Sequence, residues 1–207
     1  MKYLIGIDEA GRGPLAGPVS VGAVMVPMDF DFSLVEGVRD SKKLSEKKRE
    51  TLFARFEELQ DGGQLSFAVA FSSASIIDTR GIVFAIQSAL SRCLQELRKD
   101  RPFCKKDGPF YEVLLDGGLK APDEYLNQKT IIRGDDSEPV ISMASIAAKV
   151  LRDRHMVEIS SQYPTYGFDI HKGYGTLEHR RVLIREGLSS EHRATFCKNL
   201  RIKDKSL

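Results

Sequence analysis

The first 26 residues constrain the fold more than any other part of this sequence. Residues 2–8 form an apolar, strand-like run, and residues 19–26 form a second run that is rich in valine and lies between two prolines. The loop between the two runs is short and contains several glycines and prolines. A loop of this length suits antiparallel neighbours better than a crossover between parallel strands. The chain is therefore expected to begin with an antiparallel strand pair.

Further strands and helices follow along the chain. Three more strands are predicted, at residues 64–71, 111–115 and 130–133. The spacing of apolar residues predicts a surface helix capped by Ser45, a longer helix over 81–99, and a helix that opens at Ser137-Glu138-Pro139 and continues to residue 160. Beyond residue 176 the sequence favours short basic helices.

This order predicts an α/β fold with a mixed five-stranded sheet flanked by helices. A chain of 207 residues, 42% hydrophobic, has room for one main core. We therefore expect one domain over residues 1–160 and a helical C-terminal extension over 161–207 that packs on the same domain. No apolar stretch approaches the roughly 18 residues of a membrane span, and the N-terminal run is too short for a signal peptide. The expected protein is a cytoplasmic monomer without a membrane segment.

The charge distribution and the cysteine content limit the possible functions further. Residues 1–150 carry 20 basic and 22 acidic side chains, whereas residues 151–207 carry 11 basic and 7 acidic ones. A basic C-terminal part is expected where a protein lies along a polyanion, although a solvated helical face gives the same asymmetry. The three cysteines lack CxxC spacing, which argues against a zinc site or a disulfide framework.

Acidic residues stand at the ends of three predicted strands. Asp8-Glu9 follow the first strand, Asp116 follows the fourth, and Asp135-Asp136 follow the fifth. Strand ends meet at one edge of an open α/β sheet, so these acids can converge. Oxygen ligands without nearby histidine or cysteine select Mg²⁺ or Mn²⁺, and two such ions suit phosphoryl transfer. Because neighbouring strand residues face opposite ways, Asp8 and Glu9 can share a site only if the strand ends at about these residues.

The loop after the first strand resembles a nucleotide-binding loop at first sight. Residues 11–16 match the GxGxxA pattern of dinucleotide-binding loops. That pattern requires a helix to follow, and here a second strand follows, so we reject this interpretation. An arginine between Gly11 and Gly13 still allows the backbone to approach a sugar-phosphate chain closely.

With these residues assembled, the sequence resembles the ribonuclease HII family over nearly its whole length. The resemblance rests on segments that occur in the same order as in that family: Gly6-Ile7-Asp8-Glu9-Ala10-Gly11-Arg12-Gly13-Pro14-Leu15-Ala16-Gly17-Pro18-Val19, Asp40-Ser41-Lys42-Lys43-Leu44-Ser45, Leu115-Asp116-Gly117, Gly134-Asp135, Ala144-Ser145-Ile146-Ala147-Ala148-Lys149-Val150, Arg152-Asp153, Tyr166-Gly167-Phe168, His171-Lys172-Gly173-Tyr174-Gly175-Thr176 and His192-Arg193 before Phe196.

The resemblance implies a ribonuclease H-like fold and a metal-dependent endonuclease. Its substrates would be the RNA strand of RNA-DNA hybrids and single ribonucleotides embedded in duplex DNA, cut to 5′-phosphate and 3′-hydroxyl ends. The residues that match the family's metal-binding catalytic acids are Asp8, Glu9, Asp116 and Asp135. The residues that match its substrate-binding positions are Gly11, Arg12 and Gly13 at the ribose 2′-OH, Tyr174 at the following deoxyribose, and Lys42 and Lys43 near backbone phosphates.

Some alternatives stay open at this stage. Asp136 directly follows Asp135 and could share its role. Among the histidines, His171 is expected near the substrate, and His155, His179 and His192 at surface or packing positions. The nearest alternative family is ribonuclease HIII, which ordinarily carries an extra N-terminal domain, whereas the first strand here starts at residue 2. A nucleic-acid-binding module without activity is the other alternative, and its acids would repel phosphates unless cations were bound.

Overall fold

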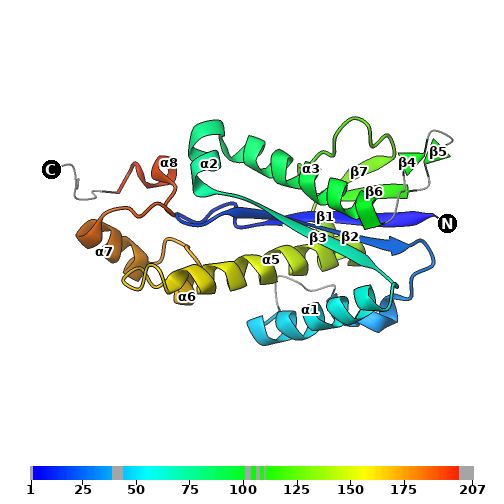
Figure 1. Ribbon diagram of the computed structural model, residues 1–207, viewed down its shortest axis with the longest axis horizontal. Coiled ribbons are helices and arrows are strands. Elements are labelled where there is room, and N and C mark those ends of the chain that lie inside the picture. Colours follow the sequence, from blue (N-terminus) through cyan, green and yellow to red (C-terminus); the bar gives the residue numbers. More distant parts are fainter. Residues whose placement is uncertain (1, 39–43, 101–103, 106–107, 110, 201–207) are drawn as a thin grey trace.

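A central sheet carries the helices on both of its faces. The computed structural model describes residues 2–38, 44–100, 104–105, 108–109 and 111–200. Its main strands are β1 (Tyr3–Ala10), β2 (Val19–Pro27), β3 (Ser66–Ser72), β6 (Tyr111–Asp116) and β7 (Gln128–Ile131). They form a five-stranded sheet in the order β3-β2-β1-β6-β7, which appears as the middle layer of Figure 1. The predicted mixed five-stranded sheet is therefore confirmed.

The strands meet partly antiparallel and partly parallel. β1 pairs antiparallel with β2, as the short loop predicted, and β2 pairs antiparallel with β3. β1, β6 and β7 are parallel neighbours, so their carboxyl ends lie at one edge. The parallel pairing of β1 with β6 ends at Ile7 and Leu115, whereas β1 continues to Ala10 beside β2. Beyond Ile7, one side of β1 is therefore open.

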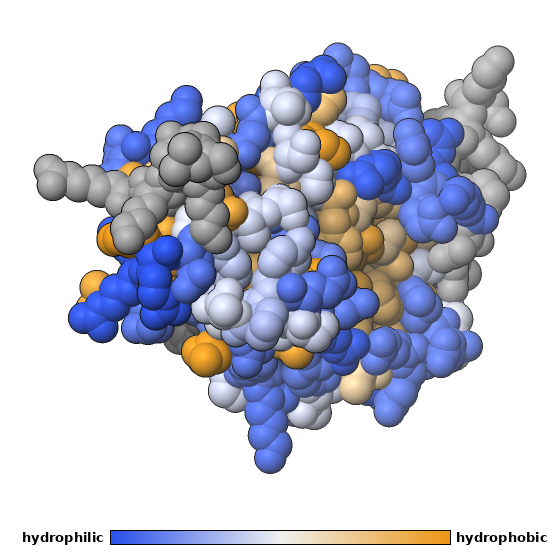
Figure 2. All heavy atoms as spheres, turned by 60° about the vertical axis from the view of Figure 1, so that its left-hand side comes forward, coloured by the Kyte–Doolittle hydropathy of each residue, from blue (hydrophilic) through white to orange (hydrophobic). Residues whose placement is uncertain are grey.

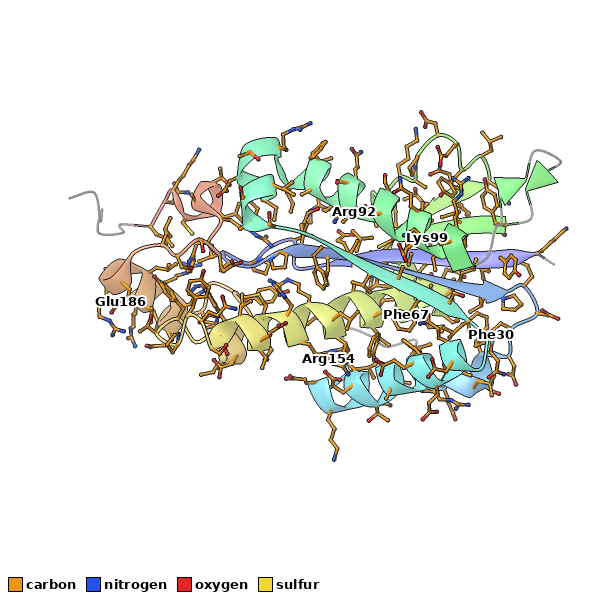
Figure 3. All side chains as sticks on the ribbon, viewed as in Figure 1. Phe30, Phe67, Arg92, Lys99, Arg154 and Glu186 are labelled. Carbon is orange, nitrogen blue, oxygen red and sulfur yellow. The ribbon has the colours of Figure 1, made fainter. Side chains whose placement is uncertain are left out.

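The long helices cover the two faces. α3 (Ile82–Asp100) and the preceding α2 (Ala74–Arg80) lie on one face, and α5 (Pro139–Ser160) and α1 (Glu46–Asp61) lie on the other (Figure 1). Strand residues that face opposite sides of the sheet belong to two separate hydrophobic cores. Ile5 packs with α3 on one side, and Val24 packs with α5 and α1 on the other. An ion pair between Arg154 and Glu50, 2.6 Å long, joins α5 to α1, and Figure 3 shows Arg154 between these helices.

Shorter elements complete the described chain. They are η1 (Phe32–Val35), β4 (Cys104–Lys105), β5 (Gly108–Pro109), α4 (Gly134–Ser137), α6 (Phe168–His171), α7 (Leu177–Glu186) and α8 (Ala194–Cys197). The last three gather at one end of the molecule, where the surface is mostly hydrophilic with scattered hydrophobic side chains (Figure 2). Of the described helices, none combines the length and apolar character that crossing a membrane requires.

One local prediction was met, two were wrong, and one helix was missed. Ser45 caps α1 as predicted, since its side chain accepts the Lys48 N–H. The long helix was predicted to open at Ser137, but a separate short turn, α4, ends at Ser137 and α5 starts at Pro139. Arg133 adopts a left-handed conformation (φ 56°) before this turn, which ends β7 earlier than predicted. The sequence analysis also missed α2, which is capped by Ser73.

Two glycines allow α5 to lie directly on the sheet. A Cβ atom at Gly6 would overlap the backbone carbonyl of Val140, and one at Gly22 would overlap the carbonyl oxygen of Ala144. The small residues Ala144 and Ala148 on α5 make the same close approach from the helix side. This contact fixes the distance between α5 and the end of β1.

We predict that Gly6→Ala lowers the free energy of unfolding by about 1–3 kcal/mol or more, because the added methyl group must push α5 away from β1. Urea denaturation measures the change. Gly118→Ala is the matched control, because a Cβ there would have no neighbour within 4 Å. Equal stability of the two variants would contradict a tight contact between α5 and β1.

Candidate active site

One pocket at the open side of β1 gathers most of the predicted site residues. The cavity measures about 420 Å³. Its walls are formed by Asp8, Glu9, Ala10, Gly11, Arg12, Gly13, Arg49, Asp116, Ser145, Ile146, Lys149 and Tyr174. The pocket thus unites three of the four predicted acids with the predicted ribose-reading loop and Tyr174. Lys42 and Lys43 lie outside the described residues.

The fold explains why Asp8 and Glu9 both reach this pocket. The strand was expected to end at about these residues; β1 ends one residue later, at Ala10, and both acids still pair with β2. Their other flank is free, since β6 leaves β1 after Ile7. Asp116 is the last residue of β6 and therefore lies beside this gap. The end of the parallel pairing, rather than the end of β1, brings the acids together.

The three acids are electrostatically unfavourable as they stand. Burial raises the pKa of Asp8 well above its usual value, and the negative charges of Glu9 and Asp116 raise this pKa further. A hydrogen bond from Ser145 and the Glu9 N–H at 2.7 Å oppose this change. Burial also raises the pKa of Glu9, while Arg12 lowers it through an ion pair of 3.3 Å. The pocket holds negative charge that its own cations offset only in part.

Asp135 and Asp136 occupy different environments. Asp135 is fully buried and lies next to Asp116, whose Oδ1 atom accepts the Asp135 N–H at 3.3 Å. Asp135 is nevertheless not among the residues that line the pocket. The exposed side chain of Asp136 forms an ion pair of 2.9 Å with Arg133. Of these two acids, Asp135 is therefore the one adjacent to the pocket.

The donor chemistry of the pocket suits a hard divalent cation. Its acidic wall offers carboxylate oxygens and a hydroxyl oxygen, with neither histidine nor cysteine in the lining. Among the described residues, no three His, Cys, Asp or Glu side chains are already drawn together as a metal-binding group. Asp8, Glu9 and Asp116 are the residues that could hold a cation here.

Several pocket residues received no role in the sequence analysis. Ser145 and Lys149 lie one turn apart on α5, so the same helix face brings both to the acids. Lys149 forms an ion pair of 2.8 Å with Asp153 and lies 5.4 Å from the centre of the Tyr174 ring. Arg49 enters the pocket from α1. The helical spacing of Ser145 and Lys149 was a signal that could have identified them.

Tyr174 is held by its backbone and leaves its ring partly exposed. Tyr174 is 41% exposed, and the cationic groups of Lys149 and Arg152 lie 5.4 and 5.8 Å from the centre of its ring. The Tyr174 N–H donates to the carbonyl oxygen of His171 at 2.9 Å. A partly exposed ring on a fixed backbone can pack against a flat or apolar surface of a ligand.

Three histidines pack beneath the Tyr174 turn. His171 stacks on His179 with ring centres 4.2 Å apart, and the Nε2 atoms of His179 and His192 lie 3.0 Å apart. The Nδ1 atom of His179 lies 2.9 Å from the carbonyl oxygen of Tyr174. Both His179 and His192 are buried, which confirms a packing position for these two. His171 also packs here, and it is not among the residues that line the pocket.

Known proteins resemble this chain over nearly its full length. A family model described as Ribonuclease HII matches residues 5–200. The chain is 42% identical to Ribonuclease HII of Caldicellulosiruptor bescii over 199 residues, which are 96% of this chain and 88% of the relative. It is 44% identical to Ribonuclease HII of Endomicrobium trichonymphae over 191 residues, 92% of this chain and 83% of the relative.

Solved structures share the fold. The structure of the PCNA:RNase HII complex from Archaeoglobus fulgidus matches with a TM-score of 0.71 and 26% identity, covering 99% of this chain and 98% of that chain. Bst-RNase HIII in complex with Mn²⁺ matches with a TM-score of 0.65 and 17% identity, covering 99% of this chain and 67% of that chain. These likenesses confirm the predicted ribonuclease H-like fold.

The buried histidines predict a loss of stability in acid. Burial, together with the neighbouring histidines, lowers the pKa of His179 to about 4 and that of His192 to about 3. An unfolded histidine has a pKa of about 6.5. As pH falls from about 6.5 to 4, the unfolded chain therefore binds protons that the folded chain excludes, and the histidines' contribution to stability is lost.

We predict that His192→Gln flattens this dependence by up to about 1.4 kcal/mol per pH unit. The measurement is urea unfolding of both proteins at several pH values between 4 and 7. The acids of the pocket titrate in the opposite direction, but they are common to both proteins and cancel in the difference. Parallel stability curves for wild type and variant would contradict a buried neutral His192.

Proposed function

The chain belongs to the ribonuclease HII family, and on that premise we propose that its pocket cuts duplex DNA at single embedded ribonucleotides as well as the RNA strand of hybrids. Family membership makes the protein a nuclease with ribonuclease H activity on RNA-DNA hybrids. One observation carries the finer proposal: Asp116, the loop at Gly11–Gly13 and Tyr174 line the same pocket. In this arrangement Asp116 would support hydrolysis, the loop would contact the ribose, and the Tyr174 ring would contact the next sugar. The three would thus act on adjacent nucleotides.

We propose that the acids bind two Mg²⁺ or Mn²⁺ ions. Asp8, Glu9 and Asp116 would hold them, with Asp135 as the adjacent fourth acid. Their all-oxygen donor set and their uncompensated charge support this proposal. When bound, such ions activate water and stabilise the charge that develops on the phosphate. Mn²⁺ is bound in the related Bst-RNase HIII, which shares the fold.

The chain's own residues bind and orient the substrate in this proposal. Arg12, Arg49 and Lys149 place positive charge around the pocket, where the phosphates of a nucleic acid strand would lie. The backbone from Gly11 to Gly13 would contact the ribose 2′-OH, the group that distinguishes RNA from DNA. The partly exposed side chain of Tyr174 would pack on the deoxyribose that follows. Hydrolysis would leave 5′-phosphate and 3′-hydroxyl ends.

Other parts of the proposal rest on the sequence. Residues 161–207 would form an extension of the catalytic domain rather than a separate domain. α6, α7 and α8 pack with Ala16 and Met156 of residues 1–160, which supports this division. Lys42 and Lys43 would contact backbone phosphates. The protein would act as a monomer in the cytoplasm.

We predict that Asp116→Asn retains the fold and lowers cleavage about a thousandfold or more, because several kcal/mol of transition-state stabilisation depend on the acids. The assay measures cutting of a duplex with one ribonucleotide, with Mg²⁺ or Mn²⁺ and with a chelator. Asp136→Asn is the matched control, since Asp136 lies on the surface in an ion pair with Arg133.

The control should cleave within a few-fold of the wild-type rate. Near-normal turnover by a folded Asp116→Asn protein would remove Asp116 from the mechanism. Wild-type binding without cleavage at any cation concentration would favour a non-catalytic binding module instead.

A further inference from the structure

Two buried arginines support the loop over residues 11–18, whose first part lines the pocket. Arg152 and Arg193 are fully buried and are the largest side chains in the described core. Arg193 reaches the loop from the segment before α8, and Arg152 reaches it from α5. Burying two like charges side by side is costly: burial and the charge of Arg152 together lower the pKa of Arg193 to about 9. Such an arrangement requires specific contacts that offset this cost.

Those contacts are hydrogen bonds to backbone carbonyl oxygens of the loop. Arg193 donates from NH2 to Gly11 O at 2.7 Å, from NH1 to Arg12 O at 3.0 Å and from Nε to Gly17 O at 2.9 Å. All three nitrogens of one planar guanidinium are therefore committed to a single loop. Arg193 does not line the pocket, so it has no direct access to a ligand there.

Arg152 holds the other end of the loop. Its guanidinium donates to the carbonyl oxygens of Pro18 at 2.9 Å and Ala16 at 3.2 Å, and to that of Lys172 at 3.0 Å. The last bond connects the loop to the turn that carries Tyr174. Gly11 has a φ of +82°, and a Cβ at this position would overlap the Arg152 side chain. The glycine is thus required by the arginine as well as by the backbone conformation.

The geometry of the peptide bond links these contacts to the pocket. In a trans peptide, the C=O and N–H groups of one plane point in opposite directions. The carbonyls of Gly11 and Arg12 point inward to Arg193, so the N–H groups of Arg12 and Gly13 point away from it. In the part of the chain that the structure describes, no protein acceptor takes either of these N–H groups. Both residues line the pocket, where a ligand oxygen can accept them.

We infer that Arg193 is a positioning residue for ribose discrimination. By fixing two carbonyls it orients the Arg12 and Gly13 N–H groups toward the ribose 2′-oxygen of an embedded ribonucleotide. This inference rests on the proposed function, because it assumes that the loop reads the 2′-OH. Arg193 itself contacts neither the substrate nor a cation.

The test is Arg193→Lys, which keeps the charge but loses the planar set of donors. For a duplex with one ribonucleotide, kcat/KM should fall about 10- to 100-fold, because a small misplacement of an oriented group has an effect of this size. The inhibition constant of the otherwise identical all-DNA duplex should stay within about twofold, because phosphate contacts do not read the sugar. Arg92→Lys is the matched control: Arg92 lies on α3 (Figure 3) and donates to the Phe71 carbonyl at 2.5 Å and the Ser72 hydroxyl at 3.1 Å, and none of its hydrogen bonds within the described chain reaches residues 11–18.

Two results would overturn the inference. One is an unchanged kcat/KM for the ribonucleotide duplex. The other is an equal loss of affinity for both duplexes, which is expected if Arg193 only stabilises the fold. If the wild-type protein does not prefer the ribonucleotide duplex, the proposed function itself fails, and this outcome is distinct from both.

A measurement on the wild-type chain covers the case in which Arg193→Lys does not fold. The amide resonances of Arg12 and Gly13 should shift when the ribonucleotide duplex is added and should shift much less with the all-DNA duplex. Equal shifts with both duplexes, or no shift with either, would contradict the assigned direction of the two N–H groups.

Discussion

The negative charge of Asp8, Glu9 and Asp116 in a partly desolvated pocket is the constraint on which the rest of the site depends. Burial and mutual repulsion raise the pKa of Asp8 and Glu9, so the folded chain holds these carboxylates at a cost in free energy. The sheet imposes this arrangement, because β6 leaves β1 at Ile7 and ends at Asp116. Ser145 and Arg12 offset only part of the cost. The proposed cations would offset the remainder.

α5 connects this charge to the recognition of substrate. Its close approach to the sheet depends on Gly6 and Gly22, which leave no side chain between helix and strands. From this fixed position, one helix supplies Ser145 to Asp8, Lys149 to the wall of the pocket, and Arg152 to the loop after β1. The acids and the substrate-reading loop are therefore held by the same element, so a shift of α5 would disturb both.

Local sequence patterns were sufficient to predict the main framework. Runs of β-branched residues predicted the five strands, and the acids at the ends of parallel strands predicted the common edge. Predictions based on one residue's immediate neighbours were less reliable. The predicted opening of the long helix at Ser137 was wrong because Arg133 turns the chain before it. The end of β1 near Asp8 and Glu9 was expected, but not that its pairing stops earlier on the β6 side than on the β2 side.

Long-range contacts could not be predicted in this way. Arg193 bonds to carbonyls 176 to 182 positions earlier in the chain, and no local periodicity indicates such a partner. The paired rings of His179 and His192 likewise depend on how α7 and the segment before α8 meet. The position of Asp135 after β7 correctly predicted that it lies at the common edge, next to Asp116. The sequence did not indicate that Asp135 lies outside the lining of the pocket.

The most direct test of the central claim is the melting temperature of the wild-type protein with and without divalent cations. If the carboxylates form a cation site, Mg²⁺ or Mn²⁺ should stabilise the folded chain by about 2.7 kcal/mol at a concentration 100 times the Kd. That corresponds to a rise of several degrees over the value in chelator, and Asp116→Asn should lose most of it. No rise in the wild-type protein, or an equal rise in Asp116→Asn, would contradict the account.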